Sequence, residues 1–491
     1  MLLYASLLVP LVASAAALAA RDVRTLGRWA VWASVTATAG FLGVAVQVFT
    51  RGPAWVGGFW MVDRFSALMI GLIQLIWMGA ALSSTRYIGE EHRTGLLSLY
   101  KVRAYYALLP AFVLAMLVTV TTNHLGFLWI ALEATTLATT PLVALYKKDG
   151  AIEAAWKYLL LCSIGISVSL LGLLLLAFAG VGAGLPIDRA LSLSDLRGVA
   201  TRLDPQVVRW AFVFLFVGIG AKVGFVPMHP WLPDAHSRTP SPISAALSGV
   251  LLNVALYALV RTRTVVDLAL AQGRWTSGFF LAFGLVSVLF AAFVLIHQQN
   301  YKRLLAYSSV EHMGLMSVGL AMGPAGAAAA VMHMVGHTLA KSSLFFTAGE
   351  ILLRTHTTKI ANIRGLWRTS PRTSLAFLVA LLGLFGLPTS ALFASELTLL
   401  MAAAHRSPSA AIAVIVALAI VAIGVLHQVF GMLFSPAEDA AEPGGRREAW
   451  QATHTVVTVQ LTLLFAAGLF FVTTPGYEWA ASVAAAFTVL P

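Results

Sequence analysis

The chain has 491 residues, of which 59% are hydrophobic and only 11% are charged, and its mean hydropathy is +0.85. Soluble proteins carry roughly 25% charged residues, so this composition excludes a soluble enzyme and a disordered protein. The net charge of +12 is spread between apolar stretches. This distribution favours a membrane protein with basic loops over a nucleic-acid-binding protein.

Apolar segments bounded by charged residues, Pro or Gly recur along the whole chain. Because they are long and continuously apolar, they predict transmembrane helices and not the alternating strands of a barrel. The first segment lacks the basic residues that precede a secretory signal, so it is interpreted as a retained span. The fourteen predicted spans lie near residues 2–20, 29–49, 65–84, 105–121, 124–145, 157–181, 209–226, 241–260, 278–297, 303–322, 327–350, 373–399, 410–433 and 452–473.

The segments between the predicted spans are short. The longest, 182–208 and 435–451, are interpreted as connectors and not as soluble domains, and the tail after Pro475 is expected at the membrane interface. The odd-numbered loops carry roughly twice as many Arg and Lys residues as the even-numbered loops. This asymmetry predicts a multi-pass protein of a bacterial or archaeal cell membrane with both termini on the outer side.

Ionisable residues occur inside or at the start of several predicted spans. A charged side chain at the centre of a bilayer costs at least ~2.5–3.5 kcal/mol, so residues retained there are candidates for function. The candidates outside the eleventh span are Glu133, Glu153, Lys157, Lys222, Glu311 and Glu396.

The eleventh span adds His333, His337 and Lys341, spaced four residues apart. This spacing places the three side chains on one face of a helix. Because histidine titrates near neutrality, such a face is suited to relay protons. Two histidines four residues apart also occur in zinc sites, but no third ligand is evident nearby in the sequence and no HExxH motif occurs, so no metal site is predicted.

Structural roles remain as alternatives for these charges. Glu153 and Lys157, four residues apart near a cytoplasmic loop, are also consistent with an interfacial ion pair. Glu133, Lys222 and Lys341 are also consistent with static buried ion pairs that hold helices in register.

Two predicted spans are expected to be discontinuous. Lys222 is followed by Pro227, and Pro388 precedes Glu396 in an otherwise apolar segment. Proline removes a backbone donor and clashes with the preceding turn, and carbonyl groups freed at membrane depth must line a buried or watery cavity. Interrupted helices at matching places in two halves indicate an ion site in a transporter with inverted repeats.

Sequence similarity between the two halves supports such repeats. GFVPMHPWLPDAH (224–236) resembles GLPTSALFASE (386–396), and EAAWKYLLL (153–161) resembles HTLAKSSLF (337–345). The predicted fold is therefore an all-α integral membrane protein with about fourteen helices and two inverted five-helix repeats, each with a discontinuous helix. Its predicted parts are N-terminal helices in 1–100, a first repeat in 101–265, a second repeat in 275–435, and a last helix with a short tail in 450–491.

The chain contains one cysteine, Cys162. A single thiol cannot hold an iron–sulfur cluster or a structural zinc ion, and it cannot form an intrachain disulfide. No cofactor is therefore predicted in this chain, and any electron transfer is expected in partner proteins.

Three long segments carry a family resemblance: GAKVGFVPMHPWLPDAHSRTPSPISAALSGV, NYKRLLAYSSVEHMGLM and HMVGHTLAKSSLFF. They resemble the antiporter-like subunits of complex I, Mrp-type cation/proton antiporters and membrane-bound hydrogenases, and the resemblance extends from about residue 65 to 435. The segments ALEATTL, EAAWKYLLL, EHMG and GVLLNVALYALVR are most similar to component F of hydrogenase 4.

The resemblance implies roles for the candidate residues. It implies that Glu133 and Lys222 form a pair whose attraction sets the proton affinity of the lysine. It further implies that the three ionisable residues of the eleventh span form a relay and that Glu396 ends it. Asn253 stands where many relatives carry a central lysine. Since asparagine cannot carry a net proton charge, water or Glu311 is expected to bridge that position.

The resemblance also implies a proton-translocating subunit, itself non-catalytic, of an oxidoreductase complex. Iron–sulfur clusters and nickel–iron or flavin centres are then expected only in other membrane and peripheral subunits. The alternatives are a subunit of an Mrp-type sodium/proton antiporter, a membrane scaffold that transports nothing, and a subunit for inorganic-carbon uptake.

Overall fold

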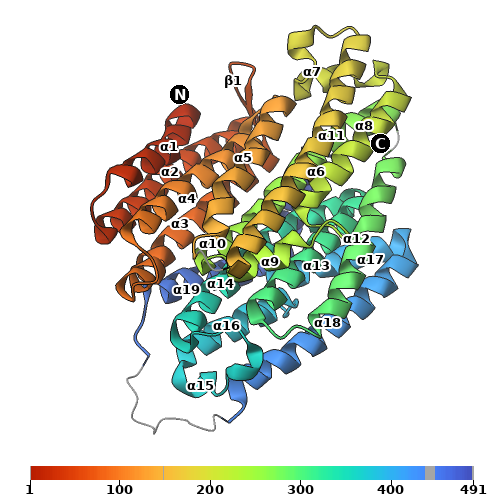
Figure 1. The fold of residues 1–491 in the computed structure, drawn as a ribbon. Helices are drawn as coiled ribbons and strands as arrows, with labels where there is room; N and C mark the ends of the chain where they lie inside the picture. The colour runs from red at the N-terminus through yellow and green to blue at the C-terminus, as the bar shows by residue number, and fades with distance from the viewer. Residues whose placement is uncertain (1, 147–148, 272, 437–447, 489–491) are drawn as a thin grey trace.

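The computed structural model describes residues 2–146, 149–271, 273–436 and 448–488. In these ranges the protein is nearly all helical, and most of its long helices run side by side in one bundle (Figure 1). Ten helical stretches of the described residues are long and apolar enough to cross a membrane. The protein is accordingly a multi-pass membrane protein, as the composition predicted.

The N-terminal part contains five helices and a β-hairpin that the sequence did not predict. The hairpin strands are antiparallel, with Ala54 opposite Val62. Asp22 and Asp63 cap the second and third helices by accepting hydrogen bonds from backbone N–H groups of the first turn. The elements are α1 (Leu2–Ala19), α2 (Val23–Arg51), β1 (Ala54–Val56), β2 (Trp60–Val62), α3 (Arg64–Arg93), α4 (Leu99–Thr121) and α5 (Leu125–Val143).

The middle part contains the first predicted break. Helix α8 ends where Gly224 adopts φ +87°, a left-handed conformation that glycine accommodates, and helix resumes only at α9. The stretch 241–270 is continuous, with a π-helical turn at η3, and its residues from Ser241 to Thr262 are all buried. The elements are α6 (Asp149–Gly182), η1 (Ile187–Arg189), α7 (Leu193–Gly198), η2 (Ala200–Arg202), α8 (Pro205–Val223), α9 (Trp231–Arg238), α10 (Ser241–Ala246), η3 (Leu247–Leu251) and α11 (Leu252–Leu270).

The C-terminal part contains the second predicted break. Gly386, at φ +68°, lies between α16 and α17. The tail predicted at the interface contains a short helix, α20, that packs on α14, α19 and α3. The elements are α12 (Arg274–Leu295), α13 (Tyr301–Ala321), α14 (Gly323–Thr355), η4 (Ile360–Asn362), α15 (Leu366–Thr369), α16 (Pro371–Leu384), α17 (Ala391–Arg406), α18 (Pro408–Phe434), α19 (Ala452–Phe471) and α20 (Thr474–Ala484).

Helix α14 forms the core of the C-terminal half. It packs against α13, α17, α19, α16 and α10, and nearly all its residues from Gly326 to Ile351 are buried. Small residues allow this close packing. At Gly336, for example, a Cβ atom would lie 2.9 Å from the side chain of Leu392 on α17. The polar residues of α14 are therefore enclosed by protein and do not face lipid.

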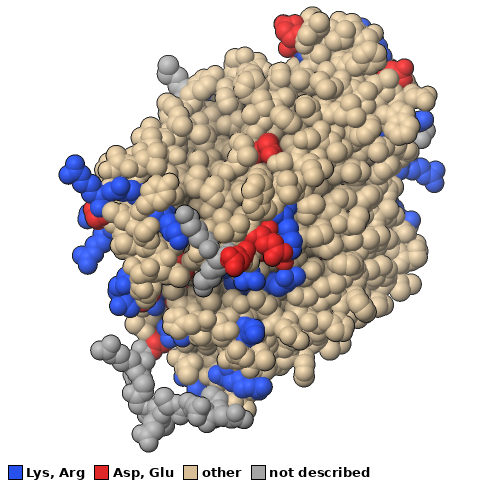
Figure 2. All heavy atoms as spheres, in the orientation of Figure 1, with Lys and Arg blue, Asp and Glu red and all other residues tan. Residues whose placement is uncertain are grey.

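All fourteen predicted segments overlap helices of the structure, with the twelfth divided between α16 and α17. Figure 2 shows a broad, mostly uncharged surface on one face with a single acidic group within it, whereas most Lys, Arg, Asp and Glu side chains lie near its margins or in one mixed cluster. This distribution is that of a surface in contact with hydrocarbon. The total of fourteen spans and the inverted repeats stay predictions.

Glu448 joins the segment before α19 to the start of α16. Its carboxylate accepts hydrogen bonds from Thr373 Oγ1 (2.5 Å) and the Arg372 N–H (2.7 Å), and it lies 3.1 Å from Arg354 Nη2 and 3.4 Å from His454 Nε2. Burial of the carboxylate favours a higher pKa. This effect is outweighed by the hydrogen bonds from His454 and Thr373, the charge of Arg354 and the backbone N–H of Arg372. Together they lower the pKa of Glu448 to about 2.

A glutamate with a depressed pKa stabilises the folded state above its ordinary pKa of 4.5, and this stability is lost as the pH falls toward 2. We expect Glu448→Gln to lower the thermal unfolding midpoint at pH 6 and to flatten its decline between pH 4.5 and 2.5. The measurement is a thermal melt of the detergent-purified protein across this range. Glu478→Gln, at an exposed position, is the control, and an equal effect of both substitutions would contradict the assignment.

Candidate functional site

Lys222 lies in the last turn of α8, directly before the break, and is completely buried. Its ammonium group donates hydrogen bonds to the backbone oxygen of Leu132 (2.9 Å) and to the hydroxyl of Thr136, both on α5. The break therefore ends α8 at the point where its only lysine faces α5. A buried ammonium group of this kind requires the partners that these two oxygens supply.

Glu133 does not contact Lys222 directly. Its Oε2 accepts a hydrogen bond from Thr136 Oγ1 (3.3 Å) and its Oε1 accepts one from Ser163 Oγ (2.5 Å) on α6. The Thr136 hydroxyl therefore accepts from the lysine and donates to the glutamate, so that it bridges the two predicted partners. We call Glu133, Thr136, Ser163 and Lys222 the Lys222 cluster.

Lys341 has a similar environment in the other half. It is completely buried on α14, and its Nζ donates to the backbone oxygen of Leu305 (2.7 Å) and to the hydroxyl of Ser308 on α13. Glu311 lies three residues after Ser308 and is buried, and its Oε2 has no hydrogen-bond partner among the described residues. We call Ser308, Glu311 and Lys341 the Lys341 cluster. Lys222 and Lys341 thus each bind a carbonyl and a hydroxyl of a helix that also carries a glutamate.

Asn253 connects α11 to α14. Its Nδ2 donates to Thr338 Oγ1 (3.0 Å) and to the backbone oxygen of Gly249 (3.2 Å), whereas its buried Oδ1 has no partner in the part of the chain that the structure describes. The side chain follows the π-helical turn η3, and such turns are frequent at functional sites. The asparagine is therefore a buried polar residue that joins the two helices.

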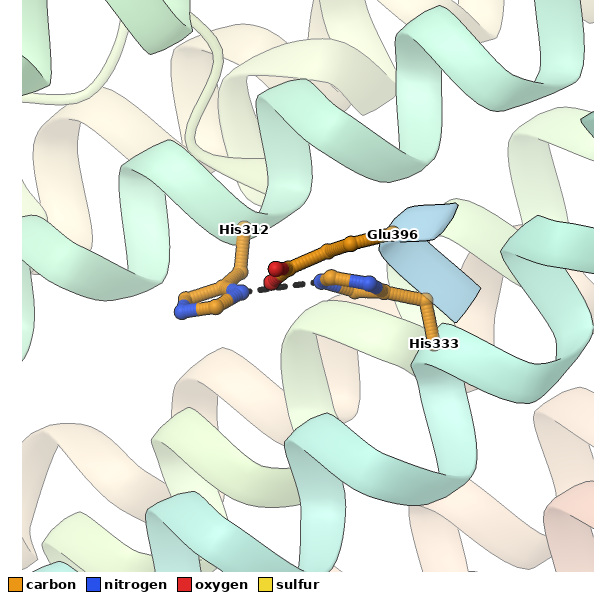
Figure 3. Close-up of side chains that lie close together, drawn as sticks. All are labelled: His312, His333 and Glu396. Atoms are coloured by element: carbon orange, nitrogen blue, oxygen red, sulfur yellow. Dashed lines mark hydrogen bonds between the residues drawn. The ribbon is translucent and has the colours of Figure 1, made fainter. Parts of the chain in front are cut away.

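A third group of side chains meets at the junction of α13, α14 and α17 (Figure 3). His312 Nδ1 lies 2.8 Å from His333 Nε2, and one ligand atom of each histidine and of Glu396 lie within 4.8 Å of one another. His333 Nδ1 lies 2.9 Å from Ser395 Oγ. We call His312, His333 and Glu396 the His–Glu cluster. The ring of His337 lies 5.5 Å from that of His312, and neither of its nitrogens has a partner.

The hydrogen bonds define the tautomers in this cluster. The Ser395 hydroxyl donates to the backbone oxygen of Leu392 (2.9 Å), so it accepts from the Nδ1–H of His333. The His333 Nε2 atom is then an acceptor and receives the Nδ1–H of His312. His333, His337 and Lys341 all contact α13, so the sequence correctly placed them on one face.

Glu396 lies beside the second helix break. A Cβ atom on Gly386 would come within 2.6 Å of Glu396 Oε2, so the carboxylate occupies space that only a glycine leaves open. Its buried Oε1 has no hydrogen-bond partner within the described ranges. Leu387, Pro388 and Thr389, which follow the glycine, are exposed. The carboxylate thus lies beside a segment whose next three residues are exposed.

Glu153 and Lys157 lie apart from these clusters. They form a 2.6 Å ion pair on α6 with side chains that are 65% and 47% exposed, and Lys157 also lies 3.2 Å from Asp234. This geometry is that of the interfacial ion pair. Pro227 and Pro388 lie in the two breaks, and both are exposed.

Sequence reasoning missed Thr136, His236, His312 and Ser395. Thr136 lies one turn from Glu133, whereas His312 and Ser395 directly neighbour Glu311 and Glu396. His236 belongs to the quoted segment 224–236, and its buried ring has no hydrogen-bond partner for either nitrogen. Proximity in sequence to a predicted site residue was the available signal for the other three.

Comparisons with known proteins agree with this architecture. The family described as NADH:quinone oxidoreductase/Mrp antiporter, TM, matches residues 122–422, which include all three clusters. A protein of Methylacidiphilum infernorum (isolate V4) named hydrogenase-4 component F homolog is 36% identical over 435 residues, which are 88% of this chain and 89% of that protein.

Two solved structures have the same fold. One is a chain of the membrane-bound sulfane sulfur reductase, an archaeal respiratory membrane complex, with a TM-score of 0.87 and 23% identity over 98% of this chain and 97% of that chain. The other is a chain of the Mrp complex from Dietzia sp. DQ12-45-1b, with a TM-score of 0.82 and 19% identity over 99% and 96% of the two chains. This multi-pass chain belongs to the transmembrane family shared by NADH:quinone oxidoreductases and Mrp antiporters.

Proposed function

We propose that the protein is a proton-translocating subunit of a membrane-bound redox complex. In this proposal, partner subunits transfer electrons and this chain couples that reaction to proton movement across the membrane. Two of the comparisons support a redox partner. One similar protein is named hydrogenase-4 component F homolog, and one similar structure is a chain of a respiratory membrane complex, the sulfane sulfur reductase. The single cysteine supports the assignment of iron–sulfur, nickel–iron or flavin centres to other subunits.

The observation that carries the proposal is the environment of Lys222 and Lys341. In a static buried ion pair, the carboxylate contacts the ammonium group directly and satisfies its charge. Here Lys222 and Lys341 instead bind a carbonyl oxygen and a hydroxyl each, and Thr136 separates Lys222 from Glu133. Each lysine can therefore exchange a proton without breaking a salt bridge.

The proposal includes an order in which the clusters act. We propose that protons approach Lys222 from the cytoplasm, pass to Lys341 and the histidines of α14, and leave near Glu396. Trp231 Nε1 donates to the backbone oxygen of Ala221 (2.9 Å), next to Lys222, and His236 of the same helix stacks on Phe345 of α14, one turn after Lys341. Helix α9 therefore lies between the two lysines, which makes His236 a candidate link together with Asn253.

The finer architecture belongs to this proposal. It includes fourteen membrane spans, both termini on the outer side, and two inverted five-helix repeats in 101–265 and 275–435. With such repeats, the two halves of the path open to opposite sides of the membrane. The similar environments of Lys222 and Lys341, and the breaks at Gly224 and Gly386, support such repeats.

The experiment compares Lys341→Met with Lys157→Met in inverted membrane vesicles that contain the complete complex. Electron transfer is started with the donor of the complex, and acidification of the lumen is followed with a fluorescent dye. We expect Lys341→Met to lower proton uptake at least about tenfold, because the buried proton carrier is lost, with the subunits still co-purifying. Lys157→Met alters only an exposed ion pair and is expected to leave uptake unchanged.

Other outcomes separate the alternatives. Unchanged uptake in Lys341→Met contradicts the relay. Loss of assembly in both Lys341→Met and Lys341→Arg favours a scaffold. Uptake that requires sodium ions, or that proceeds without an electron donor, favours a sodium/proton antiporter, and dependence on bicarbonate favours inorganic-carbon uptake.

A further inference from the structure

The His–Glu cluster contains a combination of ligands that relaying protons does not require. His312 comes from α13, His333 from α14 and Glu396 from α17, and a ligand atom of each lies within 4.8 Å of the others. In Figure 3 the carboxylate of Glu396 extends into the space beside the hydrogen bond between the two rings. Two imidazoles and one carboxylate are a ligand set that holds zinc in proteins, with the fourth position left to water.

The protein holds the His333 ring in the orientation that such a site needs. Ser395 accepts the Nδ1–H of His333, so the lone pair of Nε2 points toward His312. Metal-bound histidines commonly donate their other ring N–H to an oxygen in this way, which fixes the tautomer. Ser395 directly precedes Glu396, so a single turn of α17 supplies both a ligand and the group that orients another.

Binding an ion requires only a small rearrangement. The 2.8 Å between His312 Nδ1 and His333 Nε2 must widen to roughly 3.3 Å, because Zn–N bonds are about 2.0–2.1 Å long in tetrahedral geometry. His312 must also move its proton from Nδ1 to Nε2, an atom that has no partner now. Glu396 Oε1 is likewise buried and without a partner. The ion thus replaces one hydrogen bond and gives Glu396 Oε1 a partner, whereas the Nε2–H of His312 gains none.

The second helix break lies directly beside the cluster. The carboxylate of Glu396 lies against Gly386, and the three residues that follow this glycine are exposed. The break is the route of entry that the proposal below assumes.

We propose that His312, His333 and Glu396 form a binding site for Zn²⁺ or a divalent transition metal of the same class. The two imidazole ligands select against Mg²⁺ and Ca²⁺, which prefer oxygen. A bound ion occupies the nitrogen lone pairs at the Glu396 end of the proposed relay, so the metal acts as a reversible block of proton transfer. The binding site itself does not depend on the relay.

The test uses the full-length protein, purified in detergent and dialysed against a chelator, with Zn²⁺ as the probe. Isothermal titration is expected to detect one ion per chain, and zinc K-edge absorption is expected to show two imidazole ligands and nitrogen or oxygen donors in the remaining positions. His312→Gln and Glu396→Gln are expected to weaken binding more than about tenfold, and Ser395→Ala about 10–100-fold. His297→Gln and His427→Gln, at exposed positions, are the matched controls and should leave binding unchanged.

The proposal is overturned if the native protein binds no Zn²⁺, if its absorption spectrum shows a single imidazole, or if a control substitution removes binding as the cluster substitutions do. The spectrum of the native protein decides the question even where a substituted protein does not fold. In vesicles of the complex, Zn²⁺ is expected to stop proton uptake and a chelator to restore it. If the protein binds zinc but the complex takes up no protons, the proposed function is contradicted and the metal site is not. If saturating Zn²⁺ leaves proton uptake unchanged, the proposed block of proton transfer by the metal is contradicted.

Discussion

Lys222→Met is expected to reduce electron-transfer-driven proton uptake to the passive leak of the vesicles, with the complex still assembled. The lysine is completely buried, and methionine has a similar length but cannot hold a proton. The substitution also removes a buried charge whose burial is costly, so folding is not expected to suffer. Proton uptake and subunit composition of the same vesicles give the measurement. Uptake near that of the native protein would show that protons do not pass through Lys222.

The bridging hydroxyl gives a finer test of the same cluster. Thr136→Val keeps the shape of the side chain but removes the group that joins Lys222 to Glu133. Loss of a hydrogen bond to a charged group costs about 1.5–3 kcal/mol, which corresponds to a roughly 10–100-fold change in rate if the transfer step depends on it.

Thr140→Val is the matched control, because the Thr140 hydroxyl binds only the backbone of its own helix (2.8 Å). Equal effects of Thr136→Val and Thr140→Val would exclude a specific bridge. A loss confined to Thr136→Val would support proton transfer between Lys222 and Glu133 through the hydroxyl.

A large loss of stability is expected when the buried ion pair of Asp63 and Arg261 is broken. Arg261 Nη2 lies 2.5 Å from Asp63 Oδ1, and the two side chains are 1% and 10% exposed. The guanidinium group also lies over the ring of Tyr257, 4.7 Å from its centroid. Removing one partner leaves the other charge buried and unpaired, so Asp63→Asn or Arg261→Met alone is expected to cost about 3–5 kcal/mol.

The double substitution Asp63→Asn with Arg261→Met is expected to be more stable than either single one, because no unpaired charge remains. Thermal unfolding of the four detergent-purified proteins gives the measurement. Glu90→Gln, which breaks an exposed 2.6 Å pair with Arg93, is the control and should change stability by about 0–1 kcal/mol. Additive effects of the two single substitutions would contradict a coupled pair.

The helical segments were predictable because hydrocarbon imposes a local rule: each segment must be apolar and must satisfy its own backbone hydrogen bonds. The breaks were predictable for a related reason. Pro110 lies within α4 without ending it, whereas the breaks after α8 and α16 contain a glycine with positive φ as well as a proline. The Gly and Pro of the two similar segments were thus the relevant signal, and proline alone was not.

Other features depend on contacts between distant segments and could not be predicted. The hairpin 54–62 is too short and too irregular in sequence to stand out among apolar helices. The sequence left open whether Glu153 and Lys157 belong to a buried path, and only their exposure in the structure favours an ion pair at the surface. Thr136 and Ser395 are ordinary helix residues until another helix brings a lysine or a histidine beside them.

The sequence by itself determined that this is a helical membrane protein, which family it resembles and which charges lie inside its spans, because the cost of burying polar groups in lipid acts on each segment separately. The tertiary structure alone decided which of these charges meet. It placed a hydroxyl between Glu133 and Lys222, and it brought His312, His333 and Glu396 together from three helices. Such proximity follows from how helices pack against one another, and no spacing along a single chain records it.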